Sequence, residues 1–191
     1  MGSLVAGAAV ASPVGGTSEP TYGPAPAPLD GPELPSFRYP LGSLPTKTFN
    51  GGTAKEANVT EFPVSEKLAG VYMTLDPGAL RELHWHANAA EWQLYIKGSA
   101  RMTVFGSHGR ARTDDFAAGD VGYVPQGYGH YIENTGSEDM EVVLVLNNAT
   151  YQSISITAWM AANPDLLLST NFGVPKSVFA KFPKHAVVMP Q

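Results

Sequence analysis

The stretch GALRELHWHANAAEWQLYIKG, residues 78–98, places three metal-ligating side chains close together: His84, His86 and Glu91. Successive side chains of a β-strand point to opposite faces, so two histidines that are two residues apart point the same way. Asn88 lies among small residues and indicates a turn. After this turn an apolar run begins at Glu91. A hairpin with this turn would bring the Glu91 carboxylate beside the two imidazoles.

A fourth candidate ligand lies in a second stretch, GDVGYVPQGYGHYIEN, residues 119–134. There His130 follows a Pro-Gly turn at residues 125–127. Three imidazole nitrogens and one carboxylate oxygen suit a divalent first-row ion and leave two positions of an octahedron open. Zinc prefers four ligands and magnesium prefers oxygen. The donors alone do not separate Mn(II) from Fe, Co or Ni.

The composition indicates a globular protein. The chain has 191 residues, 43% hydrophobic and 15% charged, which is enough for one domain with a tail. The net charge is −5 and basic residues do not cluster, so we expect no nucleic-acid partner. No apolar run reaches the roughly 20 residues that span a membrane. Cysteine is absent, which excludes thiolate ligands and nucleophiles.

Residues 1–35 differ from the rest of the chain. They are small and apolar at first and then rich in Pro, Gly and Ala, which predicts a flexible tail. Residues 8–11 resemble the end of a secretory signal, but no positively charged region precedes them. Two hypotheses stay open: a secreted protein whose signal is represented only in part, or a cytoplasmic protein with an ordinary tail.

Residues 36–155 are predicted to form β-structure. Many short apolar runs, separated by turns at intervals of about 8–12 residues, favour an antiparallel sandwich or barrel. We expect short edge segments at residues 37–40 and 47–50, then a break at the pair Gly51-Gly52. After it we expect strands at residues 58–63, 69–75, 82–86, 91–96, 100–105, 111–116, 121–124, 130–134 and 141–146.

Residues 156–191 are predicted to form short helices, at residues 157–162, 165–169 and from about 175 to 182. Their many apolar side chains either cover the barrel of the same chain or pack on another subunit. We expect a homo-oligomer.

The two quoted stretches resemble the two motifs of the cupin family. Residues 78–98 fit the first motif, G-x5-H-W-H-x4-E-x6-G, and residues 119–134 fit the second, G-x5-P-Q-G-x2-H-x3-N. Within the family, RELHWH and AGDVGYVPQGYGHYIEN are similar to oxalate decarboxylases, which have two cupin domains. This chain has one copy of each motif and so resembles a single-cupin member. The resemblance implies an all-β, antiparallel jelly-roll barrel with short C-terminal helices, and an Mn(II) ion held by His84, His86, Glu91 and His130.

The resemblance also implies further site residues. In oxalate decarboxylases the arginine of RELHWH lies beside the metal, where its planar fork can hold a carboxylate substrate. Simple alternation would put Arg81 on the face opposite His84, so the strand has to bulge between them. Gln93 and Tyr95 share a face with Glu91 and are expected to line the pocket as substrate-binding residues.

One departure from the family bears on the reaction. Oxalate decarboxylases carry a proton-handling Glu in a lid of one domain or near the end of a strand of the other. Here residues 147–155, NNATYQSIS, hold no acid, and Leu144 occupies the second position.

Three functions stay open. The first is a Mn-dependent, oxalate decarboxylase-like lyase acting on oxalate or a similar small carboxylate. The second is an oxalate oxidase or another metal-dependent dioxygenase that uses dioxygen. The third is a metal-binding cupin with little catalysis and a structural or binding role. Arg81 and the intact ligands favour the first, and the missing acid favours the other two.

Overall fold

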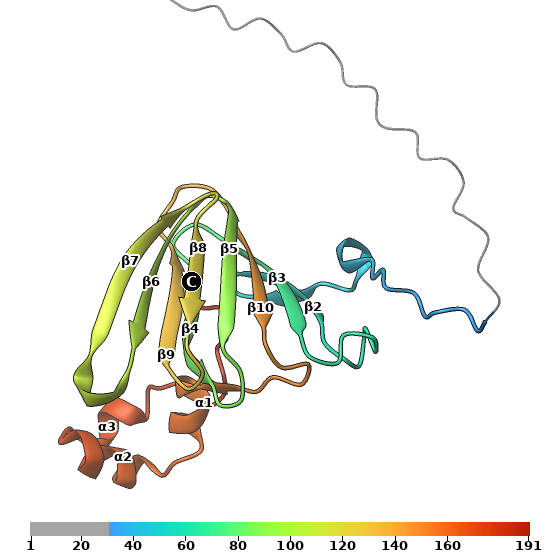
Figure 1. The fold of residues 1–191 in the computed structure, drawn as a ribbon. Helices are drawn as coiled ribbons and strands as arrows, with labels where there is room; N and C mark the ends of the chain where they lie inside the picture. Colours follow the sequence, from blue (N-terminus) through green and yellow to red (C-terminus); the bar gives the residue numbers. More distant parts are fainter. Residues whose placement is uncertain (1–30) are drawn as a thin grey trace, which may run out of the picture. The chain divides into compact units, whose positions relative to one another are not determined.

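Eleven short strands form two antiparallel sheets in residues 31–191, the part of the chain that the computed structural model describes (Figure 1). The six-stranded sheet runs in the order β1 (Lys47–Phe49), β2 (Gly52–Ala57), β3 (Ala69–Leu75), β10 (Met140–Leu146), β5 (Glu91–Lys97) and β8 (Val121–Val124). The five-stranded sheet runs in the order β11 (Ser153–Ser155), β4 (Leu80–His86), β9 (Gly129–Asn134), β6 (Ser99–Phe105) and β7 (Ala111–Ala117). From β3 to β6 and from β7 to β11 each strand lies in the sheet opposite to the one before it, as in a jelly roll. The all-β prediction is confirmed.

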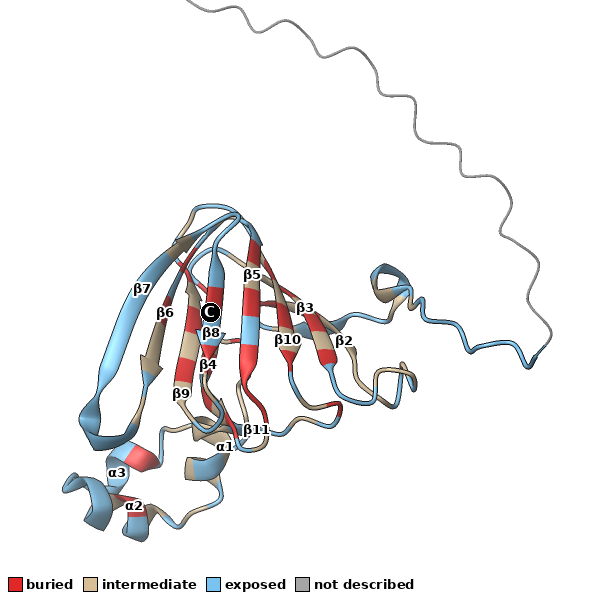
Figure 2. Ribbon diagram, viewed as in Figure 1, coloured by how far each residue is buried: buried red, intermediate tan, exposed pale blue. Residues whose placement is uncertain are grey.

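The core lies between the sheets because the strands alternate in polarity. β3 and β10 pair along their whole length, and in both every second residue is buried. The inward residues of β3 are Ala69, Val71, Met73 and Leu75, and those of β10 are Met140, Val142, Leu144 and Leu146. Figure 2 shows these buried positions on the central strands, whereas β7 is almost entirely exposed. Burying one such large apolar side chain stabilises the fold by about 2 kcal/mol.

Three short helices follow the last strand, as predicted: α1 (Ile156–Ala161), α2 (Asp165–Phe172) and α3 (Lys176–Phe179). The Ser155 side chain caps α1 by accepting a hydrogen bond from the Ala158 backbone. α2 ends at Gly173, whose φ of 66° is left-handed. Figure 1 shows the three helices together at one end of the barrel. None of the helices in residues 31–191 is long and apolar enough to cross a membrane.

The chain does not end in the helices. Beyond α3 it returns to the barrel, where Gly51 and Leu80 donate backbone hydrogen bonds to the Met189 and Pro190 carbonyls. The Glu82 backbone donates to the Val188 carbonyl in the same way, at 2.9 Å. Residues 187–190, which we call the C-terminal strap, therefore lie along β4. The sequence predicted this part only as the end of a helical segment spanning residues 156–191.

The strand predicted at residues 58–63 is a turn instead. The Asn58 side chain accepts a hydrogen bond from the Thr60 backbone at 2.7 Å, and the Asn58 carbonyl accepts one from Phe62 at 2.8 Å. Local hydrogen bonds of this kind compete with strand pairing, and here they stabilise a turn instead of a strand. The strand of this region, β2, comes earlier in the chain and begins at Gly52, although Gly51-Gly52 was predicted to be a break.

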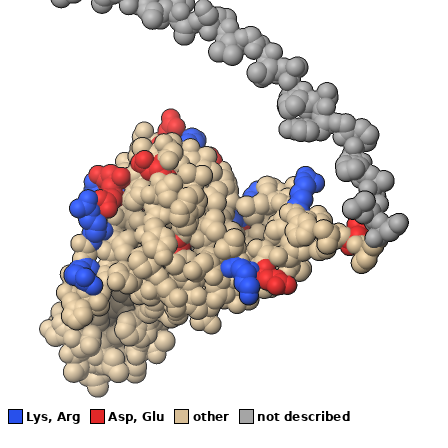
Figure 3. Space-filling view, viewed as in Figure 1, with Lys and Arg blue, Asp and Glu red and all other residues tan. Residues whose placement is uncertain are grey.

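Charged side chains on the surface lie in pairs of opposite sign. On the face shown in Figure 3, acidic and basic groups adjoin one another, with wide uncharged areas between them. Along β6 and β7 these pairs include Arg101 with Asp115 at 2.7 Å and Arg112 with Asp114 at 2.6 Å. Exposed pairs of this kind contribute little to stability, because solvent and salt screen them.

The predicted tail, residues 1–35, lies outside the described residues apart from residues 31–35. The same holds for the signal-like residues 8–11. The expectations of a flexible tail and of export stay predictions.

Gly52→Ala should destabilise the barrel, because a Cβ at Gly52 would lie 2.1 Å from the Thr74 carbonyl oxygen of β3. We expect a loss of about 2 kcal/mol in the free energy of unfolding. For a chain of this size that lowers the Tm by about 4–8 °C. Gly70→Ala on β3 is the matched control, since a Cβ there meets no atom within 4 Å. Thermal unfolding followed by circular dichroism measures both, and equal Tm values would contradict the close approach of β2 and β3.

Candidate metal centre

Four candidate ligands meet inside the barrel. His84 and His86 come from β4, Glu91 is the first residue of β5, and His130 comes from β9. One ligating atom of each side chain lies within 4.8 Å of the others, and all four residues are buried. The predicted turn around Asn88 connects β4 and β5, but the two strands lie in different sheets and form no hairpin, so Glu91 meets the histidines across the barrel. The structure thus gathers the predicted donor set at one place.

Each imidazole is oriented by a backbone carbonyl. The Nδ1 atoms of His84, His86 and His130 lie 2.7, 3.0 and 3.2 Å from the carbonyl oxygens of Glu82, Gln152 and Tyr128, respectively. A proton on Nδ1 leaves the Nε2 lone pair free, which is the arrangement that metal-binding histidines use. The Nε2 atoms of His86 and His130 lie 2.8 and 3.6 Å from Glu91 Oε2.

The electrostatics of the cluster suit a cation. Burial and the neighbouring Arg81 charge lower the pKa of His84 well below its ordinary value, so the imidazole is neutral. Burial alone would raise the pKa of Glu91, but the neighbouring imidazoles of His130 and His86 lower it well below its ordinary value. His130 Nε2 is buried without a hydrogen-bond partner among the described residues. A divalent ion would satisfy this atom, and three neutral nitrogens with one carboxylate fit such an ion.

Arg81 reaches the same interior through a bulge in β4. Arg81 pairs with Ile132 of β9 and His84 pairs with His130, so Glu82 and Leu83 together oppose only Tyr131. The extra residue shifts the alternation by one position and turns Arg81 to the inner face. The resemblance had implied a bulge here, and the pairing of β4 with β9 has one.

The Arg81 guanidinium is held at the edge of the site. Its nitrogens donate to the Ser153 hydroxyl at 3.0 Å and to the Val188 carbonyl at 3.3 Å. The side chain is 14% exposed. Burial lowers its pKa, while the charges of Glu82 and Glu91 raise it, and a guanidinium stays charged in proteins. Arg81 therefore adds a fixed positive charge beside the ligands.

Arg81 and three of the ligands, His84, His86 and Glu91, open into one small cavity of about 140 Å³. Its other walls are mostly apolar and come from both sheets and the C-terminal strap. The lining residues besides Arg81, His84, His86 and Glu91 are Lys47, Phe49, Ala54, Glu56, Val71, Met73, Leu144, Leu146, Tyr151, Val188 and Met189. A space of this size suits a small anion held by Arg81.

Gln93 and Tyr95 do not line this cavity. Both are fully buried, and they form a hydrogen-bonded chain in which Tyr95 donates to Gln93 and Gln93 donates to Glu91 Oε1, each at 2.8 Å. Their predicted inward direction is correct, but they lie behind Glu91. Gln93 and Tyr95 hold the Glu91 carboxylate in place, and we do not carry forward direct substrate contact for them.

Several cavity residues escaped the sequence analysis. Glu56 was missed because β2 was not predicted. Lys47 lies in an edge segment that was predicted, but no pattern marked it as a cavity residue. The strap residues Val188 and Met189 follow no strand or helix pattern. Tyr151 was noticed only as part of the connection after β10. Its ring centroid lies 5.5 Å from that of His86.

The connection after β10 is fixed rather than lid-like. Asn147 accepts a hydrogen bond from the Ala90 backbone, and Asn148 donates to the Asn88 carbonyl. Its last residues form β11, which pairs with β4 from Ser153 to Ser155. Leu144, where the resemblance placed an acid in the relatives, lines the cavity as an apolar residue.

Comparisons with known proteins agree with this geometry. The profile of the family described as Cupin matches residues 42–178. Oxalate decarboxylase of Bacillus subtilis is 42% identical over 166 residues, which are 84% of this chain and 43% of that protein. Oxalate decarboxylase of Arthroderma benhamiae is 42% identical over 135 residues, 70% of this chain and 32% of that protein.

A solved structure of the Bacillus subtilis oxalate decarboxylase, from work on its Mn(II) centres, matches with a TM-score of 0.80 at 39% identity. The match covers 85% of this chain and 44% of that one. The chain thus spans less than half the length of these relatives.

The metal prediction can be checked by elemental analysis. Purified protein should hold about one divalent ion per chain, and His130→Ala and Glu91→Gln should each lose most of it, because each removes one of four donors. Gln93→Leu should keep all ligands but bind the ion about 10–100-fold more weakly, since Glu91 loses its orienting partner. His108→Ala is the control, because His108 is exposed and outside the cluster. Unchanged occupancy in both ligand variants would rule out this site.

Proposed function

The chain belongs to the cupin family, and we propose that it is a Mn(II)-dependent enzyme that converts oxalate, or a similar small carboxylate, to formate and carbon dioxide. One observation carries the proposal: the bulge in β4 turns Arg81 into the cavity that three of the four metal ligands, His84, His86 and Glu91, also line. A fixed positive charge beside a metal site favours a small anionic substrate.

Mn(II) is the proposed metal because the donor set suits it and a relative at 39% identity has Mn(II) centres. Fe, Co or Ni could occupy the same donors. A divalent ion bound here would polarise a coordinated carboxylate and exchange single electrons with it. His84, His86, Glu91 and His130 would hold the ion.

The residues of this chain would bind and orient the substrate. The Arg81 guanidinium can hold one carboxylate with two parallel hydrogen bonds, which fixes the direction of the carbon–carbon bond. Val71, Met73 and Leu146 form apolar walls that exclude water and strengthen the interaction with Arg81. Ser153 and the Val188 carbonyl keep the guanidinium in one orientation.

Two other functions remain alternatives. An oxidase would pass the electrons of the one-carbon fragment to dioxygen instead of adding a proton to carbon, and the apolar Leu144 and the fixed connection after β10 favour it. A binding protein with little catalysis would need the same ligands and the same cavity.

The products of the Mn-loaded protein distinguish these functions. With oxalate and dioxygen present, we expect formate and carbon dioxide in about equal amounts. Arg81→Ala should lower kcat/KM by about 100-fold, because the carboxylate loses its charged partner at the reacting centre. Arg101→Ala, an exposed arginine on β6, is the control. Peroxide with about two carbon dioxide molecules would instead indicate an oxidase, and no product would indicate another substrate or a binding role.

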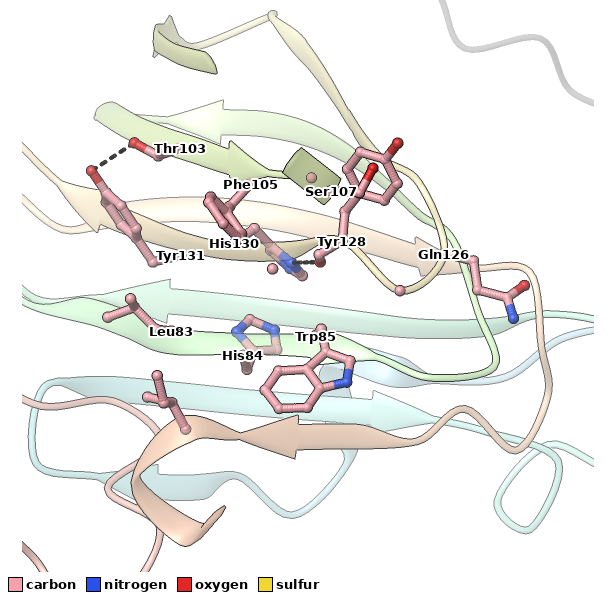
Figure 4. Close-up of a pocket in the computed structure, with 14 residues that line it drawn as sticks. Leu83, His84, Trp85, Thr103, Phe105, Ser107, Gln126, Tyr128, His130 and Tyr131 are labelled. Carbon is pink, nitrogen blue, oxygen red and sulfur yellow. Dashed lines mark hydrogen bonds between the residues drawn. The ribbon is translucent and has the colours of Figure 1, made fainter. Parts of the chain in front are cut away.

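We further propose that the protein assembles with copies of itself through an apolar groove of about 680 Å³ on the outer face of the five-stranded sheet. Figure 4 shows Leu83 and Trp85 on one side of this groove and Phe105, Tyr128 and Tyr131 on the other. Leu83 and Phe105 are 52% and 54% exposed. Exposed apolar surface of this extent is typical of an interface. The relatives carry more than half of their length beyond the matched part, and a second copy could supply the corresponding surface here.

Light scattering tests the assembly. We expect a mass of at least twice 20.2 kDa at micromolar concentration, and Phe105→Asp should shift it towards the monomer. Tyr123→Asp is the matched control, because Tyr123 is equally exposed but lies on β8 of the other sheet. A monomeric wild-type protein would refute the proposal.

A further inference from the structure

We infer that Glu56 of β2 is the catalytic residue that accepts and returns the proton during cleavage of the substrate. The inference rests on the proposed function and names the proton-handling group of the same cavity. Glu56 and Glu91 are the two carboxylates among the residues that line it. Glu91 belongs to the metal ligands, which leaves Glu56 as the carboxylate free to exchange a proton.

The register of the six-stranded sheet points Glu56 into the cavity. Glu56 pairs with Val71 of β3, and Val71 pairs in turn with Leu144 of β10. Paired residues share a face of the sheet, so Glu56, Val71 and Leu144 form one inward row. All three line the cavity. Leu144 has no carboxylate, but Glu56, two strands away in the same inward row, supplies one.

Polar neighbours hold the Glu56 carboxylate in place. Lys47 Nζ lies 2.6 Å from its Oε2, and the Asn58 amide donates to its Oε1 at 3.4 Å. The Glu56 side chain is 18% exposed, whereas that of Lys47 is 60% exposed. Burial raises the pKa of Glu56, but Lys47, Tyr151 and Asn58 lower it below its ordinary value. The group is therefore an ionised carboxylate at rest, without a proton of its own.

Tyr151 connects Glu56 to the metal ligands. Burial and the neighbouring Glu56 charge raise the pKa of the Tyr151 hydroxyl, and the Tyr151 ring packs against that of His86. Tyr151, Glu56 and Arg81 line one cavity, so a substrate held by Arg81 beside His86 also faces Glu56 and Tyr151. A proton can pass between substrate and Glu56 directly or through the Tyr151 hydroxyl.

The proton balance of the reaction fits this placement. Hydrogen oxalate carries one proton, on oxygen. Glu56 takes this proton, the carbon–carbon bond breaks, carbon dioxide leaves, and the bonding electrons stay on the remaining carbon. That carbon takes the proton back from Glu56 and becomes formate. The overall conversion of hydrogen oxalate to carbon dioxide and formate gains and loses no electrons. Without a proton donor, the fragment gives two electrons to dioxygen, which yields a second carbon dioxide and, with two protons, hydrogen peroxide.

Glu56→Gln is the primary variant, because it keeps the shape of the side chain and removes its proton exchange. In the Mn-loaded protein we expect formate production to fall about 100-fold or more, with the remaining product shifted towards peroxide. Adding Leu144→Glu to Glu56→Gln should restore formate, since it returns a carboxylate to the same inward row. Lys47→Met removes the ion pair and leaves the carboxylate, so formate production should fall less than in Glu56→Gln, without a shift towards peroxide. A purely structural ion pair predicts instead that Lys47→Met reproduces Glu56→Gln.

A second measurement does not depend on turnover. Calorimetry of oxalate binding to the Zn(II)-loaded protein at pH 7, in two buffers of different ionisation enthalpy, counts the protons taken up. We expect about one proton for the wild type, shared between oxalate and Glu56, and a clear loss of this uptake in Glu56→Gln. Equal uptake in the two proteins would overturn the inference.

The outcomes separate the two proposals. If the wild type binds oxalate but makes no formate, the proposed reaction fails, and the proton count alone decides the role of Glu56. If Glu56→Gln makes formate at the wild-type rate, the inference is wrong while the proposed function stands. If Glu56→Gln loses metal or stability, the double variant Glu56→Gln with Leu144→Glu tests the role of Glu56. If it does not restore formate production, the inference is overturned. A wild type that does not bind oxalate overturns both.

Discussion

Between Arg81 and His84, two residues of β4 face a single residue of β9. A strand in strict alternation could turn either Arg81 or the two histidines inward, but not both. The extra residue removes this conflict, and a guanidinium then shares the interior with three imidazoles. It also leaves Glu82 buried in the bulge, where its carboxylate accepts hydrogen bonds from the Val188 backbone and the Thr157 hydroxyl. One backbone irregularity thus determines the charge of the cavity and ties α1 and the C-terminal strap to the site.

The ligands were predictable because short-range spacing decides them. His84 and His86 lie two apart on one strand, and a four-residue turn brings back Glu91, so local geometry is sufficient. The alternation of side chains along the strand also predicted that Gln93 and Tyr95 point inward. Alternation does not tell how far a side chain lies from the cavity, and both lie behind Glu91.

The rest of the site depends on contacts between distant parts of the chain, which the sequence pattern does not reveal. The Gly51-Gly52 pair looked like a break, whereas Gly52 starts β2 because the lack of a Cβ allows a close approach to Thr74. The apolar stretch at residues 58–63 looked like a strand, but side-chain hydrogen bonds fold it into a turn. With β2 misplaced, the inward direction of Glu56 could not be read from the sequence. The same holds for the C-terminal strap, whose residues carry no repeating pattern and whose place depends on contacts with β4.

The rigidity of the ligand set extends beyond the ligands. Glu91 is held by Gln93, Gln93 by Tyr95, and the Tyr95 ring stacks on Phe116 with centroids 4.6 Å apart. Space for the Gln93 amide comes from Gly122 of β8, where a Cβ would lie 2.5 Å from Gln93 Oε1. A buried polar chain of this kind is favourable only when every member is satisfied. The position of one metal ligand is therefore fixed by residues from two further strands.

The C-terminal strap has a consequence for the order of folding. Val188 meets Glu82 across 106 positions of sequence and Arg81 across 107. Contacts so distant along the chain require the closure of a long loop and form slowly, whereas hairpins such as β6–β7 can form early. We expect the wall made by Val188 and Met189 to be completed late, after the ligands are already near one another. An ion that binds only the finished cavity then does little to speed folding, but it slows the reverse step, in which the strap detaches. The metal would thus prolong the lifetime of the folded protein more than it would help the chain to reach that state.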